Sequence, residues 1–469
     1  MMKNKTNRTA NPASFRDPAG FLYTENGILY RQINKSGFED YLTLVDSDLY
    51  KELVGLGALI PHEEITEFDR NSPPAKLVIK PEKIPLISYP YEWSFSQLKN
   101  AALRTLEIQK LALQKGMSLK DCSAYNIQFY RGKPVLIDTL SFESYQEGKP
   151  WAAYRQFCQH FLAPLALISY SDVRLSQLLR VYIDGIPLDL ASKLLPKKTS
   201  LNFSLNIHIH LHAKSQDRYS EKEIDPEKNR GQIKKQQLQG LIDSLESGVQ
   251  KLSWKASQTD WAEYEKFHNY SPAALEHKTE LVSEYLTHTQ SSTAWDLGAN
   301  IGFFSRLASQ QDIFTAAFDV DPGAVEMNYL RSIDEGDPNL LPLVMDLTNP
   351  SPAMGWALHE RQSLVERGRA DVVMALALIH HLAIGNNVPL SHLAQFFSSI
   401  CHWLIIEFVP KDDPQSKRLL KVRKDIFTDY NLDRFTEKFS KAFEIIEHKQ
   451  IRDTDRVLFL LRNKQSPNS

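Results

Sequence analysis

The chain has 469 residues, of which 42% are hydrophobic, and its formal net charge is -2 at neutral pH. This length exceeds what one ordinary hydrophobic core supports, so two or three domains are expected. A nearly neutral charge gives no general electrostatic footprint for nucleic acid or an anionic membrane, and no apolar run is long enough to span a bilayer.

Residues 1–17 are polar and basic and lack the apolar centre of a signal peptide, which predicts a disordered tail. The cysteines Cys122, Cys158 and Cys401 stand singly, with no CxxC pair and no disulfide framework. This usage indicates a reducing compartment, and we expect a cytoplasmic protein.

Residues 18–198 are predicted to form an N-terminal α+β domain. Short β-like runs surround a helical segment at about residues 38–57, and a long helix follows from Ser94 to Gly116. Residues 150–195 carry helical spacing and are expected to complete this domain.

Three polar residues follow the long helix at a suggestive spacing. Asp121 and Asn126 are separated by four residues, and Asp138 comes after a turn at residues 131–134. This arrangement resembles the catalytic region of the protein-kinase-like fold, in which Asp-x4-Asn lies in the catalytic loop and the Asn and a later Asp hold magnesium. The resemblance implies a tentative metal site at Asp121, Asn126 and Asp138.

The same region departs from that family's pattern. No glycine-rich phosphate loop precedes Ile28, Arg31 stands near the position that should carry lysine, and Asp138 is followed by Thr139-Leu140 instead of Phe-Gly. The alternative is that these polar residues only shape a loop and a turn. We therefore predict a degenerate kinase-like domain.

Residues 199–250 are predicted to form a strand followed by a charged linker and a helix. Leu201–His212 alternates apolar and polar residues, which would place His208, His210 and His212 on one face of a strand. That face is either a metal site or, as the alternation alone suggests, solvated. Residues 213–237 are highly charged and indicate a domain boundary.

Aromatic residues are concentrated before residue 271 and form either core or a lid over a substrate; stripes of this kind favour core. They are Trp254, Trp261, Tyr264, Phe267 and Tyr270.

A strand, glycine turn and helix follow at residues 291–310. The turn reads Gly298-Ala299-Asn300-Ile301-Gly302, so the second and third glycines of the dinucleotide fingerprint G-x-G-x-x-G are missing. Asp296 stands two residues before the first glycine. A carboxylate there would repel a pyrophosphate but attract a cationic ligand.

This turn resembles the first motif of the class I S-adenosylmethionine-dependent methyltransferases, with Asp296, Gly298, Asn300 and Gly302 at its positions. The resemblance covers about residues 255–462. It implies S-adenosylmethionine as cofactor and a doubly wound α/β fold, whose seven-stranded sheet is mainly parallel with the last strand inserted antiparallel.

Two further acids end the next strands. By resemblance, Asp319 accepts hydrogen bonds from the ribose hydroxyls and Asp346 contacts the adenine amino group. Asp321 is expected to cap the following helix, with Pro322 at its first position. Residues 370–377 form a fourth strand that leads into His380-His381-Leu382.

The chemistry implied is attack of an acceptor atom on the sulfonium methyl. His380 or His381 is a tentative general base on the acceptor side, and the alternative is that both only pack or orient a loop. Glu407 and the acids after Lys411 are further candidates, although a solvated loop after Pro410 is their more ordinary explanation.

The prediction is therefore a methyltransferase domain at residues 251–465 that acts on an unidentified acceptor, a small molecule or a saccharide. Two alternatives stay open. One is a regulatory protein that binds the cofactor without turnover, and the other is a bifunctional enzyme with phosphotransfer in the N-terminal domain. The oligomeric state is not predicted.

Overall fold

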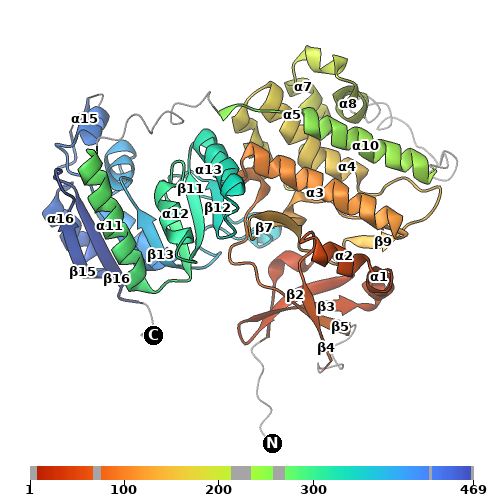
Figure 1. Ribbon diagram of the computed structural model, residues 1–469, viewed down its shortest axis with the longest axis horizontal. Helices are drawn as coiled ribbons and strands as arrows, with labels where there is room; N and C mark the ends of the chain where they lie inside the picture. The colour runs from red at the N-terminus through yellow and green to blue at the C-terminus, as the bar shows by residue number, and fades with distance from the viewer. Residues whose placement is uncertain (1–7, 67–74, 213–233, 257–269, 422–424, 466–469) are drawn as a thin grey trace, which may run out of the picture. The chain divides into compact units, whose positions relative to one another are not determined.

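The computed structural model of the chain describes residues 8–66, 75–212, 234–256, 270–421 and 425–465 (Figure 1). Contacts divide the chain into two units. Unit 1 comprises Met1–Trp254 together with Met354–Arg361, and unit 2 comprises Lys255–Ala353 together with Gln362–Ser469. None of the described helices is both long and apolar enough to cross a membrane.

Unit 1 begins with an antiparallel sheet whose strands lie in the order β1-β2-β3-β5-β4. The strands are β1 (Arg8–Ala10), β2 (Gly20–Glu25), β3 (Ile28–Asn34), β4 (His62–Ile65) and β5 (Ala75–Pro81). The helices α1 (Lys35–Asp46) and α2 (Leu49–Gly55) connect β3 to β4.

The first strand corrects the prediction of a disordered tail. Residues 1–7 lie outside the described residues, but β1 pairs antiparallel with the end of β2. The Arg8 guanidinium lies 3.7 Å from the Tyr23 ring centroid and donates to Gln32. The tail prediction is therefore wrong for residues 8–17, because cation–π contact and a hydrogen bond hold polar side chains that composition alone marks as solvated.

Helices and two small hairpins make up the rest of unit 1. In one hairpin β7 (Ile127–Tyr130) pairs with β8 (Lys133–Leu136), and in the other β6 (Met117–Leu119) pairs with β9 (Phe142–Ser144). The helices α3 (Phe95–Gln114) and α10 (Lys235–Lys251) lie side by side (Figure 1). The remaining helical segments are η1 (Pro12–Ser14), η2 (Pro90–Glu92), η3 (Ala124–Asn126), α4 (Tyr154–Phe157), η4 (Cys158–Leu162), α5 (Ala163–Tyr170), η5 (Val173–Gln177), α6 (Leu178–Val181), α7 (Leu188–Leu194), η6 (Lys197–Leu201), α8 (Phe203–Leu205), η7 (Asn206–Leu211) and η10 (Trp356–Leu358).

The strand predicted at Leu201–His212 is wrong, because this segment is helical. Asn202 caps α8, and η7 continues it as a π-helix. The His208 ring bonds Tyr154 and Ser244, while the His210 ring bonds Ser192 and Thr199. Both histidines are buried, so the alternation does not mark one solvated face. Within the described ranges, no group of His, Cys, Asp and Glu side chains is arranged to hold a metal ion.

A hairpin from the second half of the sequence, Met354–Arg361, completes unit 1. The buried Glu360 carboxylate accepts from Arg16 Nε at 3.0 Å and Nη2 at 2.7 Å, and from the Trp356 N–H at 2.7 Å. The Arg361 guanidinium lies 4.3 Å from the Tyr125 ring centroid. Charge-assisted hydrogen bonds and one cation–π contact thus anchor this hairpin.

Unit 2 is built on a seven-stranded sheet in the order β12-β11-β10-β13-β14-β16-β15. The strands are β10 (Thr293–Leu297), β11 (Phe314–Asp319), β12 (Leu340–Val344), β13 (Ala370–Ala375), β14 (Cys401–Phe408), β15 (Phe443–Gln450) and β16 (Val457–Asn463). The first five pair parallel, and β16 runs antiparallel between β14 and β15. The sheet predicted by resemblance is confirmed, including its reversed last strand.

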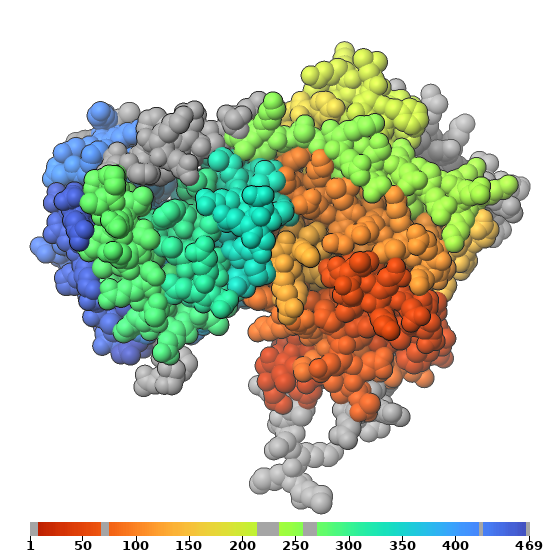
Figure 2. Space-filling view, in the orientation of Figure 1, coloured from red at the N-terminus to blue at the C-terminus, as the bar shows by residue number. Residues whose placement is uncertain are grey.

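Helices cover this sheet. They are α11 (Pro272–Thr289), α12 (Phe303–Ser309), α13 (Pro322–Glu335), η11 (His381–Gly385), α14 (Leu390–Ile400), α15 (Pro414–Leu420) and α16 (Leu432–Phe439). The apolar side of α11 packs in one core cluster with residues of β10, β13, β14 and β16, and Figure 2 shows α11 beside α12 on the viewed face. Ser271 caps α11. Asp321 caps α13 with Pro322 at its first position, as predicted.

Candidate functional site

The glycine turn joins β10 to α12 at the carboxyl edge of the sheet. Gly298, Asn300 and Gly302 all have positive φ, at 78°, 51° and 79°. A Cβ on Gly302 would lie 2.3 Å from the Asn328 side chain, so this position accepts only glycine. Gly298 is exposed, so its backbone is open to a ligand at this edge.

Asp296 is the acid that precedes the turn, and it is buried at the end of β10. Its Oδ2 accepts from Ser305 Oγ at 2.6 Å. Burial raises the pKa of Asp296 to about 6, against the hydrogen bond from Ser305 and the charge of Lys278. An ionised Asp296 is therefore costly until a cation approaches it.

Asp319 is the last residue of β11 and lies beside the turn. Its Oδ2 accepts from the Asn300 N–H at 2.7 Å, and its Oδ1 accepts from the Asp321 N–H at 2.9 Å. Burial raises the pKa of Asp319 to about 6, against these backbone hydrogen bonds. Because a carboxylate has about four lone-pair sites, Asp319 can accept a further hydroxyl donor beside its backbone donors.

Asp346 stands two residues beyond β12 and is exposed. Its Oδ1 accepts from the Thr348 N–H at 2.8 Å, and the preceding Met345 N–H donates to the Asp319 carbonyl at 2.7 Å. Because β10, β11 and β12 are parallel neighbours, the three predicted acids lie along one sheet edge.

His380 and His381 follow β13, with ring centroids 4.2 Å apart. His380 is 1% exposed, and neither ring nitrogen has a hydrogen-bond partner among the described residues. Burial and the neighbouring His381 and Arg456 hold the pKa of His380 well below its usual value. The imidazole of His380 is therefore neutral, and its acceptor nitrogen is open to a hydrogen bond from a ligand.

A buried ion network lies beyond these histidines. The Glu407 carboxylate, at the end of β14, is bound by Lys278 Nζ at 2.7 Å, Arg456 Nη1 at 3.2 Å and the Tyr270 hydroxyl. Asp413 binds the other side of Arg456, with Oδ2 2.7 Å from Nε. Glu407 is fully buried, so the interpretation as a solvated loop is wrong for this residue.

The sequence analysis missed Lys278 and Arg456. The sequence did indicate that Lys278 is buried. Leu281 and Val282 follow it at the i+3 and i+4 positions, which places Lys278 on the apolar face of α11. A lysine on such a face needs a buried anion. Of the aromatic residues singled out before residue 271, Tyr270 packs against the core, while Trp261, Tyr264 and Phe267 lie outside the described residues.

Asp121, Asn126 and Asp138 of unit 1, which the sequence suggested as a kinase-like site, all bond to other residues of unit 1. Arg31 Nη1 lies 2.8 Å from Asp138 Oδ1, and the Ser141 hydroxyl donates to Asp138 Oδ2 at 2.9 Å. Asn126 donates to the same hydroxyl at 3.4 Å, whereas Asp121 accepts from the Ser123 N–H at 2.9 Å. The structure thus links Asn126 to Asp138 through Ser141 and supplies Asp138 with its own cation.

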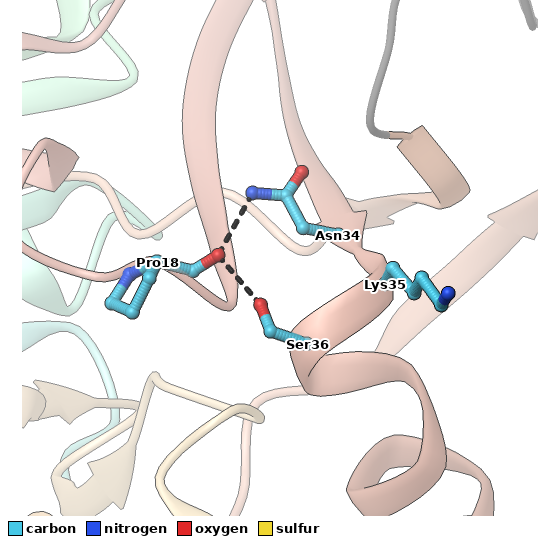
Figure 3. A pocket seen from close by; sticks show the side chains of 4 residues that line it. All are labelled: Pro18, Asn34, Lys35 and Ser36. Carbon is cyan, nitrogen blue, oxygen red and sulfur yellow. Dashed lines mark hydrogen bonds between the residues drawn. The ribbon is translucent and has the colours of Figure 1, made fainter.

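Unit 1 also carries an open cavity of about 440 Å³ where β3 meets α1. Figure 3 shows its lining: Asn34 and Ser36 both donate to the Pro18 carbonyl, and Lys35 points away from them. None of the predicted site residues lines this cavity.

Comparisons with known proteins place the chain in a family. No protein-family model matches it. The chain is 33% identical over 460 residues to nodulation protein NoeA of Rhizobium meliloti (strain 1021), covering 96% of each chain.

Three solved structures are similar to part of this chain, at low sequence identity. The N-methyltransferase NodS of Bradyrhizobium japonicum WM9 covers 41% of this chain and 98% of its own at 13% identity, with a TM-score of 0.31. Magnesium protoporphyrin IX methyltransferase of Synechocystis PCC 6803, with bound SAH, covers 40% and 84% at 14% identity and a TM-score of 0.29. WbdD covers 43% and 42% at 13% identity and a TM-score of 0.31.

These scores are too low to assign a fold, which rests instead on the strand order, the reversed last strand and the glycine turn of unit 2. S-adenosylmethionine is the cofactor of proteins with that architecture and first motif. Unit 2 has the strand order and the reversed last strand of the class I S-adenosylmethionine-dependent methyltransferases. The 33% identity over 96% of both chains shows that the chain belongs to the family of nodulation protein NoeA.

Proposed function

We propose that unit 2 binds S-adenosylmethionine and transfers its methyl group to a small-molecule or saccharide acceptor. One observation carries this proposal: the Asp319 carboxylate bonds the Asn300 amide at 2.7 Å and thereby joins the glycine turn to the end of β11. A carboxylate held beside an exposed backbone turn suits a ligand that offers hydroxyl donors.

The residues present fit this cofactor in kind and position. Asp319 would accept from the ribose hydroxyls, and Asp346, exposed on the neighbouring strand end, would accept from the adenine amino group. Asp296 would supply negative charge to the ammonium and sulfonium groups. Its raised pKa agrees with a site that awaits a cation.

The cofactor supplies an activated methyl group, so the protein mainly aligns the acceptor and removes its proton. His380 is the residue proposed for the proton, because its buried imidazole is neutral and has no partner within the described residues. His381 packs against it and is proposed to orient it. The proposed location is the cytoplasm, in keeping with three buried, unpaired cysteines.

Calorimetry with S-adenosylmethionine on the full chain tests the site. We expect Asp319→Asn to weaken binding roughly 100-fold, because a charge-assisted hydrogen bond to the ligand is lost and the turn loosens. Asp371→Asn is the matched control. The Asp371 carboxylate likewise accepts hydrogen bonds from backbone N–H groups, those of Ser292 and Thr293, but it lies at the amino ends of the strands, away from the glycine turn. Equal affinity in wild type and Asp319→Asn, or no binding at all, would show that the site assignment is wrong.

A cofactor-binding protein without turnover is the alternative. Methyl transfer from labelled cofactor across a panel of small molecules and oligosaccharides separates the two. Transfer that His380→Ala abolishes while affinity is retained would support the enzyme. Binding without transfer to any acceptor would favour the regulatory role.

We further propose that unit 1 has a kinase-like fold with a degenerate nucleotide site. The sheet order β1-β2-β3-β5-β4, with helices between β3 and β4, supports the fold together with the loop and hairpin that carry Asp121, Asn126 and Asp138. Two features argue against nucleotide binding: a 3-10 helix and Arg16 occupy the β1–β2 connection, and Arg31 pairs with Asp138.

The expected result for the full chain is no binding of ATP with magnesium, measured by calorimetry. The bifunctional alternative requires binding that Asp138→Ala abolishes. Because Asp138 is bonded within unit 1, folding of that variant is checked by thermal unfolding.

A further inference from the structure

The buried ion network of unit 2 connects parts of the site that are far apart in the sequence. Lys278 comes from α11, Glu407 from the end of β14, and Arg456 from the residue before β16. These three side chains are at most 4% exposed. Burying so many charges is costly, and hydrophobic residues would stabilise such a position as well or better. A network of this kind therefore invites a functional explanation.

Lys278 lies against the helix that follows the glycine turn. Its ammonium is 4.6 Å from the Phe304 ring centroid and 4.7 Å from that of Tyr270. Phe304 precedes Ser305, whose hydroxyl bonds Asp296. The ammonium therefore binds Glu407 directly at 2.7 Å and contacts Phe304, the residue next to the one that donates to Asp296.

Glu407 holds the turn that leads to the histidines. Its Oε2 accepts from the Ala377 N–H at 2.9 Å. Ala377 has a φ of 50°, a left-handed conformation that a residue with a Cβ adopts only when its surroundings hold it there. The next residue, Leu378, lies beside Gly298, since a Cβ on that glycine would lie 3.2 Å from Leu378 Cδ1.

We propose that Lys278 and Glu407 form a positioning pair that holds the turn after β13 against the glycine turn, so that one buried ion pair sets both the place of His380 and the charge around Asp296. This inference rests on the proposed function, because it assigns one ion pair to position both the cofactor side of that site, at Asp296, and the acceptor side, at His380. Lys278 and Glu407 are positioning residues in this proposal and do not touch the reacting atoms.

One consequence is a link between Lys278 and cofactor binding. The groups that affect the pKa of Asp296 are Ser305 from α12, which donates to it, and the charges of Lys278 from α11 and Asp319 from β11. Lys278 opposes the effect of burial on the pKa of Asp296, whereas Asp319 adds to it. Removal of the lysine charge should therefore keep Asp296 protonated to higher pH and weaken its attraction for a cationic ligand.

Two double variants of the full chain test the proposal. Lys278→Met with Glu407→Gln removes both charges and retains an acceptor for the Ala377 N–H. Lys278→Met with Glu407→Met also removes the acceptor. Both are double replacements because a lone buried charge would destabilise the fold. The matched control is Lys449→Met with Glu284→Gln, an exposed ion pair at 3.2 Å that likewise joins α11 to the sheet.

The first measurement is calorimetry with S-adenosylmethionine between pH 5 and pH 8. We expect the pH below which affinity falls to be about one unit higher in both network variants than in wild type, and unchanged in the control. Identical pH profiles in wild type and network variants would overturn the link between Lys278 and Asp296.

The second measurement is amide hydrogen exchange in the unliganded protein. Exchange at Ala377 should be roughly tenfold faster in the Glu407→Met variant, which loses one net hydrogen bond, and close to wild type in the Glu407→Gln variant. Equal protection in all variants would overturn the positioning role. This readout needs no cofactor, so a wild type that fails to bind S-adenosylmethionine would refute the proposed function while exchange still decides this inference.

Discussion

Carboxylates follow strand ends in both units: Asp319 and Asp346 at the cofactor edge of unit 2, and Asp121 and Asp138 in unit 1. The two sets differ in their counter-charges. Within the described residues, Asp319 and Asp346 form no ion pair and bond only N–H and hydroxyl donors. Asp138 is paired with Arg31, which also binds Asp17. A carboxylate whose counter-charge is already present in the fold has little left to offer a cationic ligand, so local charge balance separates the two sites better than spacing does.

Removing the counter-charge in unit 1 should have the largest effect on stability. Arg31→Met leaves Asp138 and Asp17 without their cation, and we expect a loss of about 3 kcal/mol in the free energy of unfolding, measured by urea denaturation. The double variant Arg31→Met with Asp138→Asn should recover much of this loss. A single variant as stable as wild type would show that Asp138 does not depend on Arg31 as its counter-charge.

Cofactor affinity in unit 2 should depend on pH in the opposite sense to stability. Asp296 and Asp319 both titrate near pH 6 in the fold, and a cationic ligand prefers their ionised forms. We expect affinity for S-adenosylmethionine to fall about tenfold per group from pH 7 to pH 5. Constant affinity over this range, measured by calorimetry, would mean that these carboxylates do not face the ligand.

The raised pKa of Asp296 also predicts that its ionisation lowers the free energy of unfolding of the unliganded protein. The folded state holds this proton more tightly than the unfolded chain, so the associated stability is present at low pH and is lost as pH rises through about 6. Asp296→Asn should therefore stabilise unliganded protein by about 1 kcal/mol at pH 8 and by about half of that at pH 5, while it weakens cofactor binding. Thermal unfolding at the two pH values checks this.

The smallest effect is expected at the hairpin of unit 1. Arg16 is partly exposed, and Arg16→Gln should cost about 0.5–1 kcal/mol because the Glu360 carboxylate keeps only the Trp356 N–H. Arg174→Gln, which removes a similar but exposed pair with Asp172, is the control and should leave the melting temperature unchanged. Equal changes in stability in the two variants would show that the Arg16–Glu360 pair does not anchor the hairpin.

The parts of the molecule that could be predicted from the sequence are those encoded over short stretches. The glycine turn, the acid at the end of each successive strand and the Asp321 cap are local patterns, and the structure contains each of them. The seven-stranded sheet followed because its strands come in order along the chain.

The errors arise where distant residues decide the outcome. Lys278 and Glu407 are 129 residues apart, and Glu407 and Arg456 are 49 apart, so no local pattern could join them. Alternation misled at His208 and His210 because Tyr154 and Ser192, from other helices, satisfy their rings. The paired strand at residues 8–10 was missed because its stability comes from Tyr23 and Gln32.

The hairpin Met354–Arg361 has a consequence for synthesis. Unit 1 is encoded almost entirely before residue 255, but Glu360 and Arg361 emerge from the ribosome only after β10, β11 and β12 of unit 2 have been made. Domains usually fold one after another as they appear. In this chain the first unit is complete only when residues 354–361 have been made, so in a nascent chain stopped before residue 354 the Arg16 guanidinium lacks the Glu360 carboxylate. Because each unit is made of two separate stretches of the chain, no single cleavage can release the two units intact.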